Sequence, residues 1–186
     1  MTAKFDPGPT LMLFRGRNPD VTVWKRFRSG VDGFTFEKKG EVYEAYVGAN
    51  AERVVDLFYT LSEQLAPAID TVIADLRTQT TWNGESIALP DVRDAVARLK
   101  VPLATYGGVE FSLYTPDDQL TLTPQLELFI YARSDRWLYL LQGKGLEEKA
   151  ALADRSWRSQ AWDRAPAPTL SAAIAAASER LSLTQA

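Results

Sequence analysis

The sequence predicts an α+β domain whose mainly antiparallel sheet is built from three blocks of strands separated by helices, with two helices at the C-terminus. Three observations lead to this class. Hydrophobic residues make up 46% of the 186 positions, which is enough for one sizeable core. Short segments of alternating apolar and polar residues occur in groups. Longer segments with apolar residues at helical spacing separate those groups.

The N-terminal block predicts an antiparallel meander. Residues 18–20 have the sequence Asn-Pro-Asp, a strong turn signal, and residues 21–28 then alternate as a strand does. Residues 34–38 and 41–47 predict the next two strands, joined by a tight Lys-Gly connection at residues 39–40. We expect strands that follow one another in the chain to pair with each other.

The middle of the chain predicts two helices and a hairpin. A helix is expected at about residues 50–65, because Asn50 suits an N-cap and apolar residues follow at helical spacing. The Asn-Gly pair at residues 83–84 lies between strand-forming residues, so it predicts a hairpin turn. A second helix is expected from Pro90 to the region of Pro102, which closes it.

The third block predicts the centre of the sheet. Residues 109–115 alternate, and a turn follows them at residues 115–119. Residues 125–132 and 137–142 are apolar on both faces and predict a hairpin. Strands of this kind are central and covered twice, so we expect helices on one face and further protein, or a second subunit, on the other.

Two helices are predicted after the sheet. The first covers residues 146–162, and the second is an Ala-rich helix at about residues 170–183 that follows a stiff Pro-Ala spacer beginning at residue 165. We therefore expect residues 1–164 to form a single domain. The spacer and helix of residues 165–186 are expected to pack on that domain or on a partner.

The composition restricts the chemistry that is available. The chain has no Cys and no His, so it has no disulfide, thiol nucleophile, His-ligated metal or Ser-His-Asp triad. Lys and Arg number 21 against 24 Asp and Glu, and this balance does not favour nucleic acid or an anionic membrane as the partner. We expect no cofactor, and an enzyme would be left with carboxylates and an oxygen-ligated divalent ion.

The N-terminal residues give no sign of export. Pro7 and Pro9 interrupt a region without an apolar run of signal-peptide length. No segment approaches the roughly 18 uninterrupted apolar residues of a membrane helix. The sequence therefore predicts a soluble, cytoplasmic protein without a membrane partner.

Four acidic residues are the candidates for catalysis or metal binding. Asp117 and Asp118 follow Pro116, and Glu110 and Glu127 lie in neighbouring predicted strands. Convergence of these carboxylates would support a carboxylate or divalent-metal enzyme as the alternative function. The competing interpretation is ordinary turn chemistry for the two aspartates.

A basic stretch near the N-terminus is a second candidate. Residues 1–40 hold eight Lys and Arg against four Asp and Glu, a balance of 8 − 4 = +4. Trp24, Arg26 and Arg28 interleave an aromatic ring with cations, as a single-stranded nucleic-acid binder would. The competing interpretation is an edge strand protected by charge, with its arginines paired to the acidic remainder of the chain.

Aromatic residues near predicted turns are the third candidate. Tyr131 and Trp137 flank a predicted Arg-Ser-Asp-Arg turn, and Trp162 precedes the Pro-Ala spacer. Tyr, Trp and Arg are enriched where proteins bind one another. The outline of strand blocks and helices resembles small bacterial α+β proteins that bind other proteins, such as secretion chaperones and immunity proteins, although no motif is shared.

These observations favour a non-catalytic protein-binding module of the adaptor, chaperone-like or immunity-like kind. The expected partner is another protein, the chain itself, or both, with self-association through the apolar sheet region 126–141 or the last helix. The enzyme is the first alternative. A weak single-stranded nucleic-acid binder that uses the basic N-terminal strands is the second.

Overall fold

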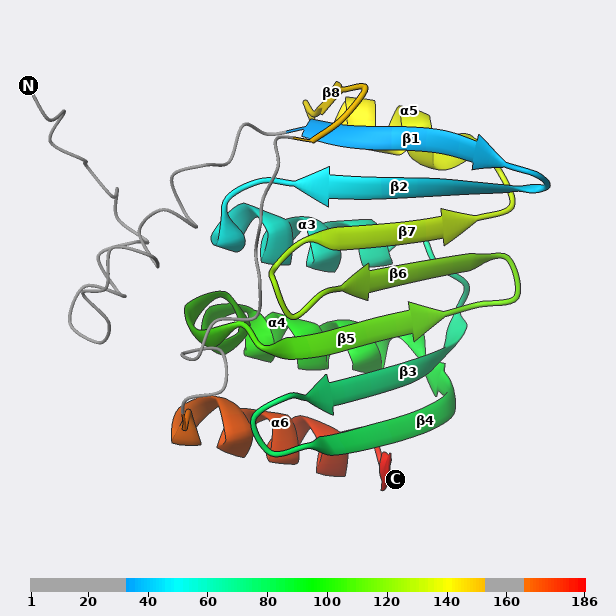
Figure 1. Cartoon of the computed structure of the whole chain (residues 1–186). Coiled ribbons are helices and arrows are strands. Elements are labelled where there is room, and N and C mark those ends of the chain that lie inside the picture. The colour runs from blue at the N-terminus through cyan, green and yellow to red at the C-terminus, as the bar shows by residue number, and fades with distance from the viewer. Residues whose placement is uncertain (1–32, 153–165) are drawn as a thin grey trace, which may run out of the picture.

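The α+β class is confirmed by the computed structural model, which describes residues 33–152 and 166–186 (Figure 1). Within these residues the chain forms one nine-stranded sheet and four helices. The predicted turn and strand at residues 18–28 lie outside the described residues. Most of the helix predicted at residues 146–162 lies outside them as well.

The strands occur in the sheet in the order β8-β1-β2-β7-β6-β5-β3-β4-β9. They are β1 (Gly33–Lys39), β2 (Val42–Gly48), β3 (Ala68–Asp75), β4 (Thr80–Ala88), β5 (Val109–Tyr114), β6 (Asp118–Leu122), β7 (Leu128–Ala132), β8 (Glu147–Glu148) and β9 (Thr184–Gln185). Neighbouring strands are antiparallel except for β1 and β8, which run parallel and are joined by a bond from the Lys149 amide to the Phe34 carbonyl. The sheet is therefore mixed and not purely antiparallel, which corrects the finer part of the prediction.

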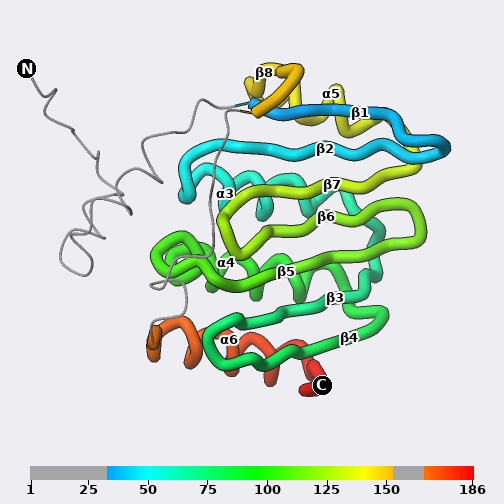
Figure 2. The backbone as a smooth tube through the Cα atoms, in the orientation of Figure 1, coloured from blue at the N-terminus to red at the C-terminus, as the bar shows by residue number. Residues whose placement is uncertain are grey.

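The helices lie on one side of the sheet (Figures 1 and 2). They are α3 (Ala51–Ser62), α4 (Leu89–Tyr106), α5 (Arg136–Gly143) and α6 (Pro168–Arg180). Helices α3, α4 and α6 are arranged side by side, with α4 in contact with both others, and α5 lies behind the β1 edge (Figure 1). The last helix therefore packs on the domain itself, against α4.

Helix α3 illustrates how the local sequence produces the covered layer. The Asn50 side chain accepts a hydrogen bond from the Arg53 amide at 3.0 Å, which caps the helix where the sequence predicted. One side of the helix is buried, and the Phe58 ring meets Phe111 of β5 with ring centroids 5.3 Å apart. The helix predicted at residues 50–65 is thus confirmed, and its apolar side faces the sheet.

Residues 137–142 form most of helix α5, so the strand predicted there is wrong. Trp137 and Leu141 are four residues apart, and both are fully buried, as helical spacing requires. The segment is nearly all apolar, and such a run fits a helix and a strand equally well in periodicity. Residues 147–148, predicted as helix, form strand β8 instead, because they pair with the start of β1.

The Asn83-Gly84 pair lies inside β4, so the hairpin turn predicted there is wrong. The β3–β4 turn falls at residues 76–79, where the Arg77 amide donates to the Asp75 carboxylate at 2.8 Å. A Cβ atom on Gly84 would lie 2.4 Å from the Leu183 side chain. A larger residue at this position would have to displace the ends of the Leu183 and Ile87 side chains. Close packing therefore favours glycine here and produces the same dipeptide as a turn.

Two further boundaries differ from the predicted ones. Pro102 lies within α4, which continues to Tyr106, because the buried side chains on either side of the proline keep the helix packed on the sheet. Strand β6 had no predicted counterpart. The Thr115 amide donates to the Asp118 carbonyl at 2.8 Å, so the turn after β5 is tighter than predicted and the strand starts at Asp118.

Candidate functional site

The side of the sheet opposite the helices is its open face, because no described element covers it (Figure 1). Side chains alternate along each strand, so β7 directs Leu128, Ile130 and Ala132 to the helices. The same strand directs Phe129 and Tyr131 to the open face. The apolar character of β7 on both sides, which the sequence predicted, therefore places aromatic rings on a surface without a described cover.

Three aromatic residues form a patch on this face, which we call the aromatic patch: Tyr46, Phe129 and Tyr131. Tyr46 of β2 lies directly opposite Phe129 of β7, and their ring centroids are 5.0 Å apart. Tyr46 is 44% exposed and Tyr131 is 38% exposed. Exposed rings of this size on neighbouring strands are typical of surfaces that bind other molecules.

The open face is acidic. Among the residues that β1, β2, β3, β5, β6 and β7 direct to it, the charged ones are Glu37, Glu44, Asp70, Glu110 and Lys39, so the formal charge of this part of the face is 1 − 4 = −3. Glu44 lies directly opposite Tyr131, next to the aromatic patch. The face thus combines exposed rings with excess negative charge.

Lys39 is already paired with these acids. Its ammonium lies 2.6 Å from the Glu44 carboxylate and 3.8 Å from that of Glu37. The hydrogen bond and the charge of Glu44 raise the pKa of Lys39 above its ordinary 10.5, and Glu37 adds to the effect. One lysine therefore offsets part of the negative charge at the β1–β2 end of the open face.

The centre of the open face is a polar network. Ser112 and Thr121 are buried, and their hydroxyl oxygens are 2.9 Å apart. The Gln119 amide donates to the Thr121 hydroxyl at 3.0 Å, and the Ser112 hydroxyl donates to the Glu110 carboxylate at 3.3 Å. Because these groups bond to one another, the network provides a pre-ordered polar floor beside the aromatic patch.

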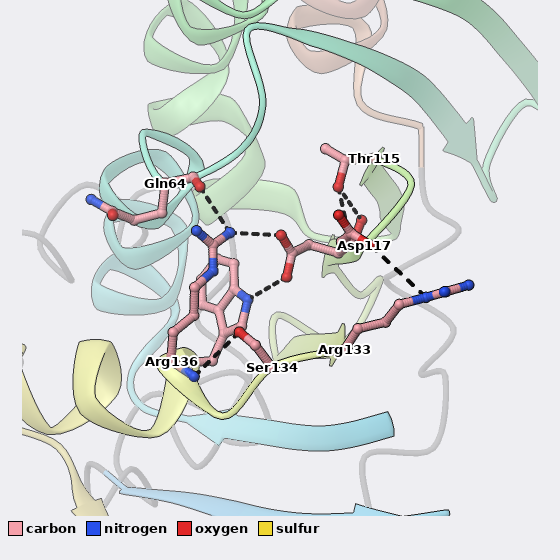
Figure 3. Close-up of polar contacts among 8 residues, drawn as sticks. Gln64, Thr115, Asp117, Arg133, Ser134 and Arg136 are labelled. Atoms are coloured by element: carbon pink, nitrogen blue, oxygen red, sulfur yellow. Dashed lines mark hydrogen bonds and ion pairs between the residues drawn. The ribbon is translucent and has the colours of Figure 1, made fainter. Parts of the chain in front are cut away.

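A hollow of about 590 Å³ lies at the far end of β5, β6 and β7. Polar contacts of the residues around it, among them Gln64 and Arg136, are drawn in Figure 3. Asp118 holds three segments together there. One Asp118 oxygen accepts from the Trp137 indole at 2.8 Å, and the other accepts from the Arg136 guanidinium at 2.6 Å. Arg136 also donates to the Gln64 carbonyl at 3.0 Å. Asp118 is only 9% exposed and both its oxygens are bonded, so its geometry fits a structural clamp.

The four candidate carboxylates do not converge. Asp117 lies in the turn before β6 and Asp118 is the first residue of β6, whereas Glu110 and Glu127 lie at the opposite end of these strands. Asp117 is exposed and lies 4.0 Å from Arg133, a pairing that is typical of a surface turn. Within residues 33–152 and 166–186, no three acidic side chains are grouped closely enough to hold a metal ion. The geometry therefore gives no support to the carboxylate enzyme.

The candidate binding residues divide into three groups. Tyr131 lies on the open face. Trp137 is fully buried and bonded to Asp118, so it is part of the core in this structure. Residues Trp24, Arg26, Arg28 and Trp162 lie outside the described residues.

Sequence reasoning missed two members of the open face, Tyr46 and Phe129. A signal was present, because Tyr46 interrupts the apolar alternation of its strand with a large ring on the polar side. The patch depends on the pairing of β2 with β7, which joins residues more than 80 positions apart. Local patterns do not contain that pairing.

The chain matches no model of a protein family, no curated protein and no solved structure. Among the helices that the structure describes, none is both long and apolar enough to span a membrane.

Proposed function

We propose that the chain is a non-catalytic protein-binding module whose binding surface is the open face of the sheet. The observation that carries the proposal is the exposure of Tyr46 and Tyr131 on central strands, on the side that no described element covers. Contiguous exposed rings of this kind mark interaction sites more often than chance surface positions do. The hydrogen-bonded hydroxyl groups of Ser112 and Thr121 would supply the polar part of such an interface and help to position the partner on it.

The proposed partner is a segment of another protein that carries basic and apolar side chains. A cation would meet Glu44, which lies directly opposite Tyr131 of the aromatic patch, and arginine would also stack on the tyrosine rings. Self-association through this face would place two surfaces of formal charge −3 against each other. Charge complementarity therefore favours a basic partner over a second copy of the chain at this face.

The test uses the full chain and a twelve-residue peptide of alternating Arg and Phe, with a Glu-Phe peptide as its charge-reversed control. We expect chemical-shift changes at Tyr46, Phe129 and Tyr131 with the Arg-Phe peptide, and affinity that falls as salt rises. The Glu-Phe peptide is expected not to bind. Shift changes confined to α4 or α6 would overturn the proposal.

A pair of tyrosine variants sharpens this test. Tyr131→Ser removes a ring from the aromatic patch, so we expect about tenfold weaker binding of the Arg-Phe peptide, the size of a moderate interface contribution. Tyr139→Ser is the matched control, because Tyr139 is 64% exposed but lies on α5, away from the open face. Equal weakening by both substitutions would contradict a site on the open face.

A further inference from the structure

We propose that residues 21–28 of the same chain bind the open face and thereby compete with the protein partner. The competition with a protein partner rests on the function proposed above, whereas the contact between residues 21–28 and the open face does not. The charge and the aromatic rings of this segment suit the open face. These eight residues have the sequence Val-Thr-Val-Trp-Lys-Arg-Phe-Arg, so they contain three cations and no acid. Their formal charge of +3 matches the −3 of the open face, and their two aromatic rings match the aromatic patch.

The spacing of these side chains also suits the open face. In an extended segment, Lys25 and Phe27 project to one side, and Trp24, Arg26 and Arg28 project to the other. The first side therefore presents a cation and a ring together, at the separation of alternate residues along a strand. The open face offers a similar alternation, because Glu44 and Tyr46 follow each other at alternate positions of β2.

Residues 21–28 are close enough to β1 along the chain to reach the open face. Residue 28 is five positions before Gly33, the first residue of β1, and five extended residues span about 17 Å. The order β1-β2-β7 places the aromatic patch one and two strands from β1, or about 5 to 10 Å across the sheet. Residue 24 is nine positions before Gly33, and nine extended residues span about 30 Å. The whole basic stretch can therefore reach the acids and rings of the open face of its own molecule.

Tethering gives this contact a regulatory consequence. A segment held by a short connection is present at the face at an effective concentration in the millimolar range. The partner would bind only the fraction of molecules in which the face is free, so its apparent affinity would fall by that fraction. The chain would thus favour partners that displace its own basic stretch.

The contact can be tested on the unmodified protein with a carbodiimide, which activates a carboxylate for attack by a lysine amine. An amide then links the two side chains, and the carbodiimide leaves as its urea. We expect mass spectrometry of the monomer band to find Lys25 joined to Glu44 or Glu37. Links from Lys25 only to acids of the helix side, such as Asp56 or Asp91, would overturn the contact, and so would links found only in a dimer band.

The competition is tested with charge-reversed variants of the full chain. Arg26→Glu with Arg28→Glu frees the face, so we expect the Arg-Phe peptide to bind about tenfold more tightly than to the wild type. Arg15→Glu with Arg17→Glu is the matched control, because it changes the net charge equally outside residues 21–28. Equal tightening in both variants would reflect net charge alone and would overturn the competition.

The two experiments separate this inference from the proposed function. Suppose that Lys25 is linked to the open face but the Arg-Phe peptide binds that face in neither variant. The protein-binding function is then contradicted, and the contact between residues 21–28 and the open face is supported. Suppose instead that the Arg-Phe peptide binds the open face, that Lys25 is linked elsewhere, and that Arg26→Glu with Arg28→Glu leaves the affinity for the peptide unchanged. The contact and the competition are then contradicted, and the protein-binding function is supported.

Discussion

The two faces of the central sheet differ although they are built from the same strands. On β5 and β6, Phe111 and Leu120 meet the helices and are fully buried, while Ser112 and Thr121 form the polar floor of the open face. One position along the strand changes the surroundings of a side chain from the apolar core to a buried polar network. Strand β7 breaks this rule, because it carries large apolar side chains on both faces. The departure from alternation in β7 therefore places apolar side chains on the face that no described element covers.

The largest expected difference between the faces is in their contributions to stability. We expect Phe111→Ala to lower the free energy of unfolding by about 3–5 kcal/mol, because it leaves a cavity beside Phe58 in the core. Phe129→Ala makes the same chemical change on the open face, where Phe129 is only half-buried, so we expect a cost of about 1 kcal/mol. Urea unfolding of both variants measures the difference. Equal costs would mean that the open face is as well packed as the covered one.

Elements whose pattern is local were predictable from the sequence. The helix at α3 and the strand at β5 each show one clear period, so both were found. The hairpin turn predicted at Gly84 was wrong, because the glycine is explained by its packing against Leu183, a residue almost 100 positions away. Helix α5 was missed for a similar reason, because burial of Trp137 depends on Asp118 of β6.

The candidate site was predictable only in part. Tyr131 was found because it lies in an apolar strand beside a turn, and its strand was expected to need cover on both faces. Tyr46 was not found, because its place in the patch depends on the pairing of β2 with β7. Long-range strand pairing is the information that single-sequence patterns lack.

A smaller effect is expected at Asp118, a polar exception on the covered side of β6. Asp118→Ala would leave the Trp137 indole and the Arg136 guanidinium without their shared acceptor, so we expect a loss of about 2–3 kcal/mol. Asp118→Asn keeps an oxygen for the indole and should cost about 1 kcal/mol less than the alanine variant. Urea unfolding measures both variants. A loss below about 0.5 kcal/mol for the alanine variant would mean that the clamp contributes little.

The smallest effect concerns Lys39, the cation on the open face. Glu44 raises the pKa of Lys39 above 10.5, so Glu44→Gln should lower that pKa toward its ordinary value. A pKa raised by folding means that the pairing stabilises the protein below pH 10.5 and that this stabilisation is lost as the pH rises through the raised pKa. We therefore expect the wild type to exceed Glu44→Gln slightly in stability below pH 10.5, with the difference vanishing above the raised pKa.

An NMR titration of the Lys39 side chain gives the two pKa values for this comparison. Glu37→Gln is the matched control, because Glu37 lies 3.8 Å from the Lys39 ammonium whereas Glu44 lies at 2.6 Å, and we expect it to produce the smaller decrease. An unchanged Lys39 pKa in the Glu44 variant would show that the pairing is absent in solution.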